Sequence, residues 1–335
     1  MKTIDMSRPR YDYDGVEHDK QWIENWYLNA VNSSSKKNSI KNRLNRLRHL
    51  SAVEKDIRKD LIEDLQSILI GDPLVLDKFR DSYGKRIDAL DVSAKPIRKG
   101  KGRRPKTFKE KLLAAFGYNN ARHNVLIQLA NYLNIKTCPY CNLHYTLTIR
   151  DIKAQDKQVL MAKMQFDHFF DKAAYPFLSM SLYNLIPSCP ICNQGKSQSQ
   201  LSLEFHPYYS NIYELYKFRV KNPLGLFIGD TKDQVELELV KQKGGAMKQF
   251  DQVFHITKLY ERHRDIAQEE FAKAYLNYYY GYPEFFGFIN DDSLRKLLIY
   301  GHYNDKEDIV KRPMSKFKQD LWEQAKEEID FIKLP

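Results

Sequence analysis

The 335-residue chain has only four cysteines and no long apolar run. Four cysteines are too few for a disulfide scaffold in a chain of this length. No stretch reaches the roughly 18 consecutive apolar residues of a membrane-spanning helix, so we expect no membrane partner. Because the N-terminus lacks the apolar centre of a secretory signal peptide, the sequence favours a cytoplasmic protein. With 42% apolar and 13% aromatic residues, the chain can bury a substantial core.

Acidic residues are in the minority, since 54 Lys and Arg face 43 Asp and Glu, and the net charge is +11. A basic chain favours a polyanionic partner such as nucleic acid. Nine basic residues and one acid fall between residues 93 and 111. Prolines and glycines interrupt this stretch, which predicts a basic linker and not a helix. It serves either as a solvated tether or as a nucleic-acid contact, and the candidate phosphate-binding residues are Lys99, Lys101, Arg103 and Arg104.

Apolar periodicity divides the rest of the chain. Residues 1–92 are expected to form a helical N-terminal region, and residues 210–335 a mainly helical C-terminal region that includes a strand at 235–240. Between the linker and residue 209, the pattern changes after one or two helices into short strands and turns, which indicates a compact core over 112–209. The predicted fold class is therefore mainly α with a small central α+β core.

All four cysteines occur in two matched C-x-x-C pairs, and each pair is part of a Cys-Pro-x-Cys-Asn sequence. Two such turns supply the four thiolates of a tetrahedral zinc site. A glutaredoxin-like redox site would need a preceding βαβ pattern, whereas a helix precedes the first pair here. A closed four-cysteine shell leaves no position for substrate, so we expect a structural zinc. The predicted ligands are Cys138, Cys141, Cys189 and Cys192.

Between and just after the cysteine pairs lie an Asp-His step, an Asn-Leu step and a Cys-Asn-x-x-Lys sequence, in that order. This set resembles the core of HNH endonucleases, whose His-metal finger is a ββα unit. The resemblance covers less than a quarter of the chain. It implies that Asp167 and His168 end the first strand, and that Asn193 stands on the helix that follows the second cysteine pair. It also implies that a four-cysteine zinc site staples this finger.

The resemblance assigns each residue a role. His168 would be the general base that activates water, because an imidazole titrates close to neutral pH. Asp167 and Asn193 would be the ligands of a catalytic Mg²⁺ or Mn²⁺, since both offer hard oxygen atoms. Asn184 would hold the loop that orients His168, and Lys196 would lie near the phosphate.

One further histidine, His206, follows the second cysteine pair closely enough to reach such a site.

The implied activity is metal-dependent hydrolysis of phosphodiester bonds, with DNA favoured and RNA, including tRNA, left open. The helix at 259–265 and the spacing of the core are similar to HNH proteins of bacterial anti-phage systems, including the Septu-type nuclease subunit encoded beside an ABC-type ATPase, sometimes with a retron. That similarity implies a defence role and an ATPase partner.

The alternative is a non-catalytic zinc-ribbon module that binds nucleic acid or a partner and carries a degenerate HNH site. The presence of Asp167, His168 and Asn193 together favours the enzyme. A degenerate site would be expected to have lost at least one of these three side chains.

Overall fold

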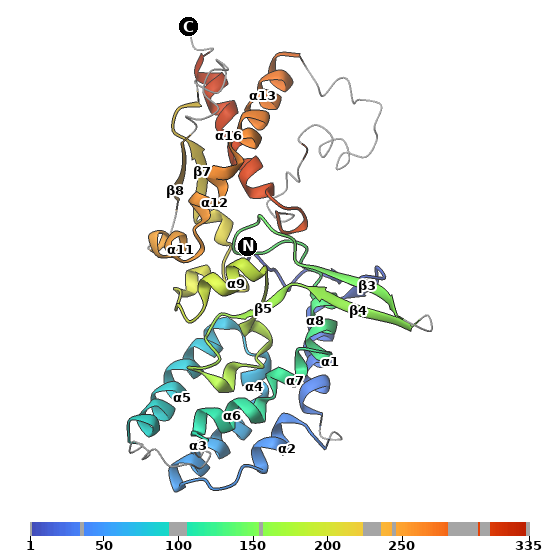
Figure 1. Cartoon of the computed structure of the whole chain (residues 1–335), viewed down its shortest axis with the longest axis vertical. Helices are drawn as coiled ribbons and strands as arrows, with labels where there is room; N and C mark the ends of the chain where they lie inside the picture. Colours follow the sequence, from blue (N-terminus) through green and yellow to red (C-terminus); the bar gives the residue numbers. More distant parts are fainter. Residues whose placement is uncertain are drawn as a thin grey trace.

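The computed structural model describes residues 2–33, 37–93, 106–153, 157–223, 236–242, 246–280, 301 and 309–332. Most of these residues are helical, and the strands form small two-stranded sheets (Figure 1). The four linker residues proposed to contact phosphate (Lys99, Lys101, Arg103 and Arg104) lie outside the described residues. None of the described helices is long and apolar enough to cross a membrane.

The N-terminal region is helical, as its periodicity predicts. Two short strands, β1 (Arg10–Tyr11) and β2 (Glu17–His18), form a hairpin before the first helix. The helices are α1 (Lys20–Asn32), α2 (Ile40–Asn45), α3 (Ala52–Glu63), α4 (Leu65–Ile70) and α5 (Pro73–Ser93). A capping box between Ser51 and Glu54 starts α3. Gly71 and Asp72 separate α4 from α5, because Pro73 cannot continue the preceding helix.

Three helices lead from the linker to the first cysteine pair: α6 (Phe108–Phe116), α7 (Tyr118–Ala121) and α8 (Val125–Leu133). Thr107 and Glu110 form a capping box, so α6 begins inside the range predicted for the linker. Gly117 then adopts a left-handed conformation, with a φ of 76°, and turns the chain into α7. This connection brings Tyr118 beneath the central strands.

The central region contains two antiparallel hairpins and a short helix. Strands β3 (Leu147–Lys153) and β4 (Lys157–Lys163) form one hairpin, and β5 (Gln165–His168) and β6 (Leu185–Ser188) form the other. In the second hairpin Gln165 lies opposite Ser188 and His168 opposite Leu185. Helix α9 (Pro190–Lys196) follows β6 directly. Between β5 and β6 run the 3₁₀ turns η2 (Pro176–Leu178) and η3 (Leu182–Asn184).

The C-terminal region combines a hairpin with helices. After the 3₁₀ turns η4 (Leu203–Phe205) and η5 (Ile212–Glu214), β7 (Tyr216–Val220) pairs with β8 (Leu237–Lys241), close to the strand predicted at 235–240. The remaining elements are α11 (Met247–Phe254), α12 (Ile256–Tyr260), η6 (Glu261–His263), α13 (Arg264–Tyr280), η7 (Ile309–Lys311) and α16 (Ser315–Ile332). Helices α13 and α16 pack against each other beside β7 (Figure 1).

Strand β5 and helix α9 lie between the N-terminal helices and the C-terminal elements (Figure 1). The buried apolar residues of all three regions belong to one continuous core. Tyr27 of α1 donates a hydrogen bond to the Met180 carbonyl at 2.8 Å, and the ring of Phe254 stacks on Tyr140 at 4.6 Å. The central region is therefore in contact with both the N-terminal and the C-terminal regions.

Candidate functional site

The four cysteines come together in one buried cluster, with all four sulfur atoms within 4.8 Å of one another. The Sγ atoms of Cys141 and Cys189 are 4.0 Å apart. A disulfide requires about 2.05 Å between its sulfurs, whereas a tetrahedral zinc ion with Zn–S bonds of about 2.3 Å places them roughly 3.8 Å apart. The cluster therefore fits one metal ion such as zinc, in agreement with the pairing predicted from the sequence.

Local sequence explains how the second pair is presented. Cys189 is the N-cap of α9, and its sulfur accepts the backbone N–H of Cys192 at 3.4 Å. Pro190 fixes the first helical residue, where no N–H is needed. Gly195 lets α9 approach α11 closely, because a Cβ at this position would lie 3.3 Å from the Val253 carbonyl oxygen. The second pair is thus a rigid strand-to-helix corner.

The first pair is held by the chain's C-terminal region. Asn142 is buried in a left-handed turn, and its amide donates to Thr137 at 3.1 Å and to the Ile309 carbonyl at 2.8 Å. Its Oδ1 accepts the backbone N–H of Lys316 at 2.9 Å. Asn142 and Asn193 are equivalent in the two Cys-Pro-x-Cys-Asn sequences, but only the first serves as a structural anchor of this kind.

Hydrogen bonds favour thiolate character at Cys141 and Cys189, whereas burial raises the pKa of Cys138 and hydrogen bonds to neighbouring thiols raise that of Cys192. The neighbouring thiol of Cys138, followed by those of Cys141 and Cys192, lowers the pKa of Cys189. The Leu143 N–H donates to the Cys141 sulfur at 3.4 Å, and His144 Nδ1 lies 3.7 Å from the same atom. Because a thiolate is the form that binds metal, Cys138 and Cys192 would release their protons when an ion binds.

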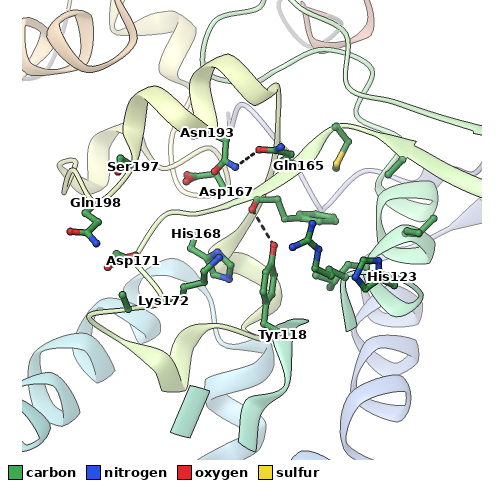
Figure 2. Close-up of a pocket in the computed structure, with 17 residues that line it drawn as sticks. Tyr118, His123, Gln165, Asp167, His168, Asp171, Lys172, Asn193, Ser197 and Gln198 are labelled. Atoms are coloured by element: carbon green, nitrogen blue, oxygen red, sulfur yellow. Dashed lines mark hydrogen bonds between the residues drawn. The ribbon is translucent and has the colours of Figure 1, made fainter. Parts of the chain in front are cut away.

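A cavity of about 600 Å³ opens beside the cluster, between β5, α9 and the α7–α8 segment (Figure 2). Three of the five predicted catalytic residues line it: Asp167, His168 and Asn193. The other lining residues are Tyr118, Arg122, His123, Leu126, Ile127, Ala162, Met164, Gln165, Phe166, Asp171, Lys172, Ala173, Ser197 and Gln198.

Asp167 is almost fully buried at the wall of this cavity. Its Oδ2 accepts the Tyr140 hydroxyl at 2.7 Å, and its Oδ1 lies 3.3 Å from Lys196 Nζ. Burial raises the pKa of Asp167, and the ammonium of Lys196 and the hydroxyl of Tyr140 oppose this effect. Tyr140 lies between Cys138 and Cys141, so a hydrogen bond joins the carboxylate to the turn that carries the first cysteine pair.

His168 ends β5, and its ring is held in one orientation. Its Nε2 lies 3.0 Å from the Ser179 carbonyl oxygen. Because a carbonyl oxygen only accepts hydrogen bonds, Nε2 carries the hydrogen, and Nδ1 is the nitrogen that can take up a proton. Burial lowers the pKa of His168 to about 3, and the nearby ammonium of Lys172 adds to this effect. The ring packs edge-on against Tyr118, with ring centroids 4.5 Å apart.

Asn184 lies outside the cavity and is completely buried behind it. Its Oδ1 accepts the Phe170 N–H at 2.7 Å, while its amide donates to the carbonyls of Phe170 at 3.0 Å and Leu178 at 2.9 Å. These bonds hold the two ends of the segment from Phe170 to Leu178 together. Ser179, whose carbonyl contacts His168, follows this segment directly. Asn184 thus ties Phe170 to Leu178, and its role in orienting His168 stays a prediction.

Asn193 and Lys196 project from α9 in different directions. The amide nitrogen of Asn193 donates to Gln165 Oε1 at 2.5 Å, which leaves Oδ1 as its second polar atom at the cavity (Figure 2). Lys196 has no exposed surface and does not line the cavity. Its ammonium donates to the His168 carbonyl at 2.7 Å and pairs with Asp167. In this structure Lys196 supports the carboxylate and is not positioned at a phosphate.

His206 lies in the core behind the site. It is fully buried, packs on the ring of Phe169 at 4.2 Å and does not line the cavity. Its Nδ1 accepts the Tyr208 N–H at 3.3 Å, and no described atom pairs with its Nε2. Burial lowers the pKa of His206 to about 3.

Three further polar side chains line the cavity that the sequence patterns did not mark as site residues: Arg122, His123 and Lys172. Lys172 is half-buried, and its ammonium lies 4.6 Å from the centre of the Tyr118 ring. Burial lowers its pKa. The only local signal was the position of Lys172 four residues after His168, which is not part of the resemblance.

The buried histidines predict acid sensitivity. A histidine with an ordinary pKa of 6.5 when unfolded and about 3 when folded takes up its proton only on unfolding between these values, so stability falls as pH falls. Each such histidine contributes a slope of about 1.4 kcal/mol per pH unit. We expect His206→Phe to flatten the decline of the melting temperature with falling pH. His263→Phe, at a half-exposed position, is the control, and an unchanged slope in His206→Phe would contradict the prediction.

Comparison of the chain with models of protein families, with curated proteins and with solved structures finds no match in any of the three.

Proposed function

We propose that the protein is a metal-dependent endonuclease of the HNH type that hydrolyses phosphodiester bonds in nucleic acid, with DNA as the favoured substrate. One observation carries the proposal: His168 ends β5 at the wall of a cavity that it shares with Asp167 and Asn193. The strand–strand–helix order of β5, β6 and α9 is the order that the resemblance requires.

His168 is oriented to act as the base. Its lowered pKa keeps the ring neutral at physiological pH but also makes it a weak base, and the negative charge of a bound phosphodiester would raise that pKa so that Nδ1 can accept a proton from water. The Nε2–H bond to Ser179 fixes the tautomer and the ring direction, and Asn184 fixes the segment that holds Ser179. Attack by that water forms a new P–O bond, the bond to the leaving oxygen breaks, and the leaving oxygen takes a proton from solvent.

Asp167 and Asn193 are suited to hold a magnesium or manganese ion, since a carboxylate and an amide oxygen line the same cavity. Each oxygen of Asp167 already accepts one hydrogen bond and retains a second lone pair. When bound there, the ion would polarise a phosphoryl oxygen and stabilise the charge that develops on it. Lys196 and Tyr140 keep the carboxylate in place.

The charge around the cavity fits a phosphodiester. The cations Lys172 and Arg122 line the cavity beside the carboxylates of Asp167 and Asp171, and such cations stabilise the negative charge of a phosphoryl transition state. The basic linker of residues 93–111 is proposed as an additional phosphate contact. The resemblance to anti-phage HNH proteins supports, as a further part of the proposal, an ABC-type ATPase partner and a defence role.

A non-catalytic zinc-ribbon binding module is the second candidate, and one observation favours it. Both oxygens of Asp167 are already engaged, by Tyr140 and by the ammonium of Lys196. A carboxylate neutralised in this way can be part of a structural network that needs no catalytic metal.

Cleavage assays separate the two candidates. The purified chain is incubated with supercoiled plasmid and with total RNA, with Mg²⁺ added or omitted, and with or without the product of the neighbouring gene. The proposal predicts strand cleavage that requires added Mg²⁺. If a folded, zinc-loaded protein binds nucleic acid but cuts neither substrate in any of these conditions, the binding module is the better account.

Lys172→Met tests the proposed charge stabilisation. Because the variant retains an aliphatic side chain over Tyr118 but loses the ammonium, we expect the cleavage rate at saturating substrate to fall by about 10²-fold. Binding should change much less. Lys258→Met, at an exposed position on α12, is the matched control. A Lys172→Met rate close to the wild-type rate would show that the ammonium does not act on the phosphate.

A further inference from the structure

The candidate catalytic cavity has the size of a small-molecule binding site, and its two ends differ in character. Figure 2 shows His168 between the ends, with Asp171, Ser197 and Gln198 on one side and His123 on the other. The polar side suits the charged backbone of a nucleic-acid strand, whereas the side at His123 is built differently.

Apolar side chains gather at the His123 side of the cavity. His123 lies just before the N-cap of α8, so the first turn of this helix is on the same side, and α8 packs against β4. Four cavity-lining residues from this turn, from β4 and from the position directly after β4 form what we call the apolar end: Leu126, Ile127, Ala162 and Met164. A charged phosphodiester gains nothing from such a surface, whereas a flat, weakly polar group is removed from water there. The apolar end therefore suits a different chemical group next to the reacting phosphate.

Two exposed polar side chains accompany the apolar end. Arg122 and His123 line the cavity, and neither side chain has a hydrogen-bond or ion-pair partner in the part of the chain that the structure describes. A guanidinium offers five hydrogen-bond donors, and both a guanidinium plane and an imidazole ring stack on unpaired bases. Apolar side chains beside free stacking and donor groups are the features of a pocket that receives a nucleobase.

We propose that the apolar end of the cavity holds one unpaired nucleobase of the substrate strand, beside the phosphodiester at His168. The inference rests on the proposed function, which places a phosphodiester in this cavity, because the nucleotide next to that phosphate then supplies the base. Inside a duplex the faces of a base are covered by its stacked neighbours, so a base must leave the stack before it can enter a pocket. The substrate is therefore a single strand, or a duplex in which one nucleotide has become unpaired.

The test removes apolar surface without changing charge. In Ile127→Gln/Met164→Gln, two partly exposed residues of the apolar end become polar. The matched control, Val53→Gln/Leu74→Gln, makes the same kind of change at exposed positions on α3 and α5. Fluorescence anisotropy without added Mg²⁺ measures the binding of three labelled DNA probes: a single strand, a strand of equal length whose sugars carry no bases, and a fully paired duplex. Circular dichroism and zinc content establish that each variant is folded.

We expect wild type to bind the single strand about tenfold more tightly than the strand without bases, the usual contribution of one stacked base. In Ile127→Gln/Met164→Gln this preference should disappear, while binding of the strand without bases and of the duplex stays at the wild-type level. The control should keep the preference. Equal binding of the two strands by wild type, or a variant that keeps the preference or weakens binding of all three probes equally, would overturn the proposal.

Cleavage of the same single strand with added Mg²⁺ separates this proposal from the proposed function. A wild-type protein that prefers the strand with bases but cuts no nucleic acid would count against the nuclease and not against the base site. A wild-type protein that cuts the strand but binds it no better than the strand without bases would count against the base site alone.

Discussion

Cys189→Ser is expected to lose zinc and much of the folded structure. Cys189 supplies one of four clustered sulfurs and also caps α9, so its loss opens the metal shell and weakens the corner between β6 and α9. Structural zinc sites contribute apparent binding energies of about 10–16 kcal/mol, which couple directly to folding. Elemental analysis should fall from about one zinc per chain to a small fraction, and the variant should be insoluble or melt far below wild type.

Ser188→Ala is the matched control, because Ser188 is a buried neighbour that supplies no sulfur. This control should keep its zinc and change the melting temperature only slightly. Wild-type protein that contains no zinc when purified without chelator, or a Cys189→Ser variant as stable as wild type, would show that the cluster does not hold a structural metal.

His168→Ala is expected to give a folded, zinc-loaded protein whose cleavage rate falls by about 10²–10⁴, the usual contribution of a general base. The substitution removes Nδ1 but leaves the cysteine cluster and the Asp167–Lys196 pair in place. Nucleic-acid binding should remain close to wild type. The measurement is the single-turnover rate of cleavage of a labelled duplex with saturating Mg²⁺.

His263→Ala, at a half-exposed position on η6, should cut at the wild-type rate. If His168→Ala also cuts at the wild-type rate, His168 is not the base. If the variant cuts slowly but has lost its zinc or its melting transition, the effect is structural and does not support the proposed role.

The cysteine cluster and the order of the central elements could be predicted because their information is local. A C-x-x-C turn presents two sulfurs by itself, and Pro190 sets the start of α9. The positions of Asp167 and His168 at the end of β5 were implied by the resemblance and not by the local sequence alone. The alternating pattern near residues 235–240 likewise identified a strand, whose partner β7 could not be named in advance.

The partners of the site residues could not be predicted because they come from distant parts of the chain. Tyr140 reaches Asp167 where the fold brings the two cysteine turns together. Lys196 turns inward to the same carboxylate, where the resemblance placed a lysine near the phosphate. His206 was only a possible additional site residue, and it lies in the aromatic core. Contacts of this kind depend on tertiary packing, which periodicity does not encode.

The claim that water attacks phosphorus in the proposed hydrolysis is tested most directly by cleavage in water enriched in ¹⁸O. A labelled DNA duplex is cut once with Mg²⁺, and the new ends are analysed by mass spectrometry. We expect a terminal phosphate that carries one ¹⁸O atom, because the attacking oxygen comes from solvent. A terminal phosphate without ¹⁸O would identify another nucleophile, and the absence of cut product would contradict the proposed hydrolysis altogether.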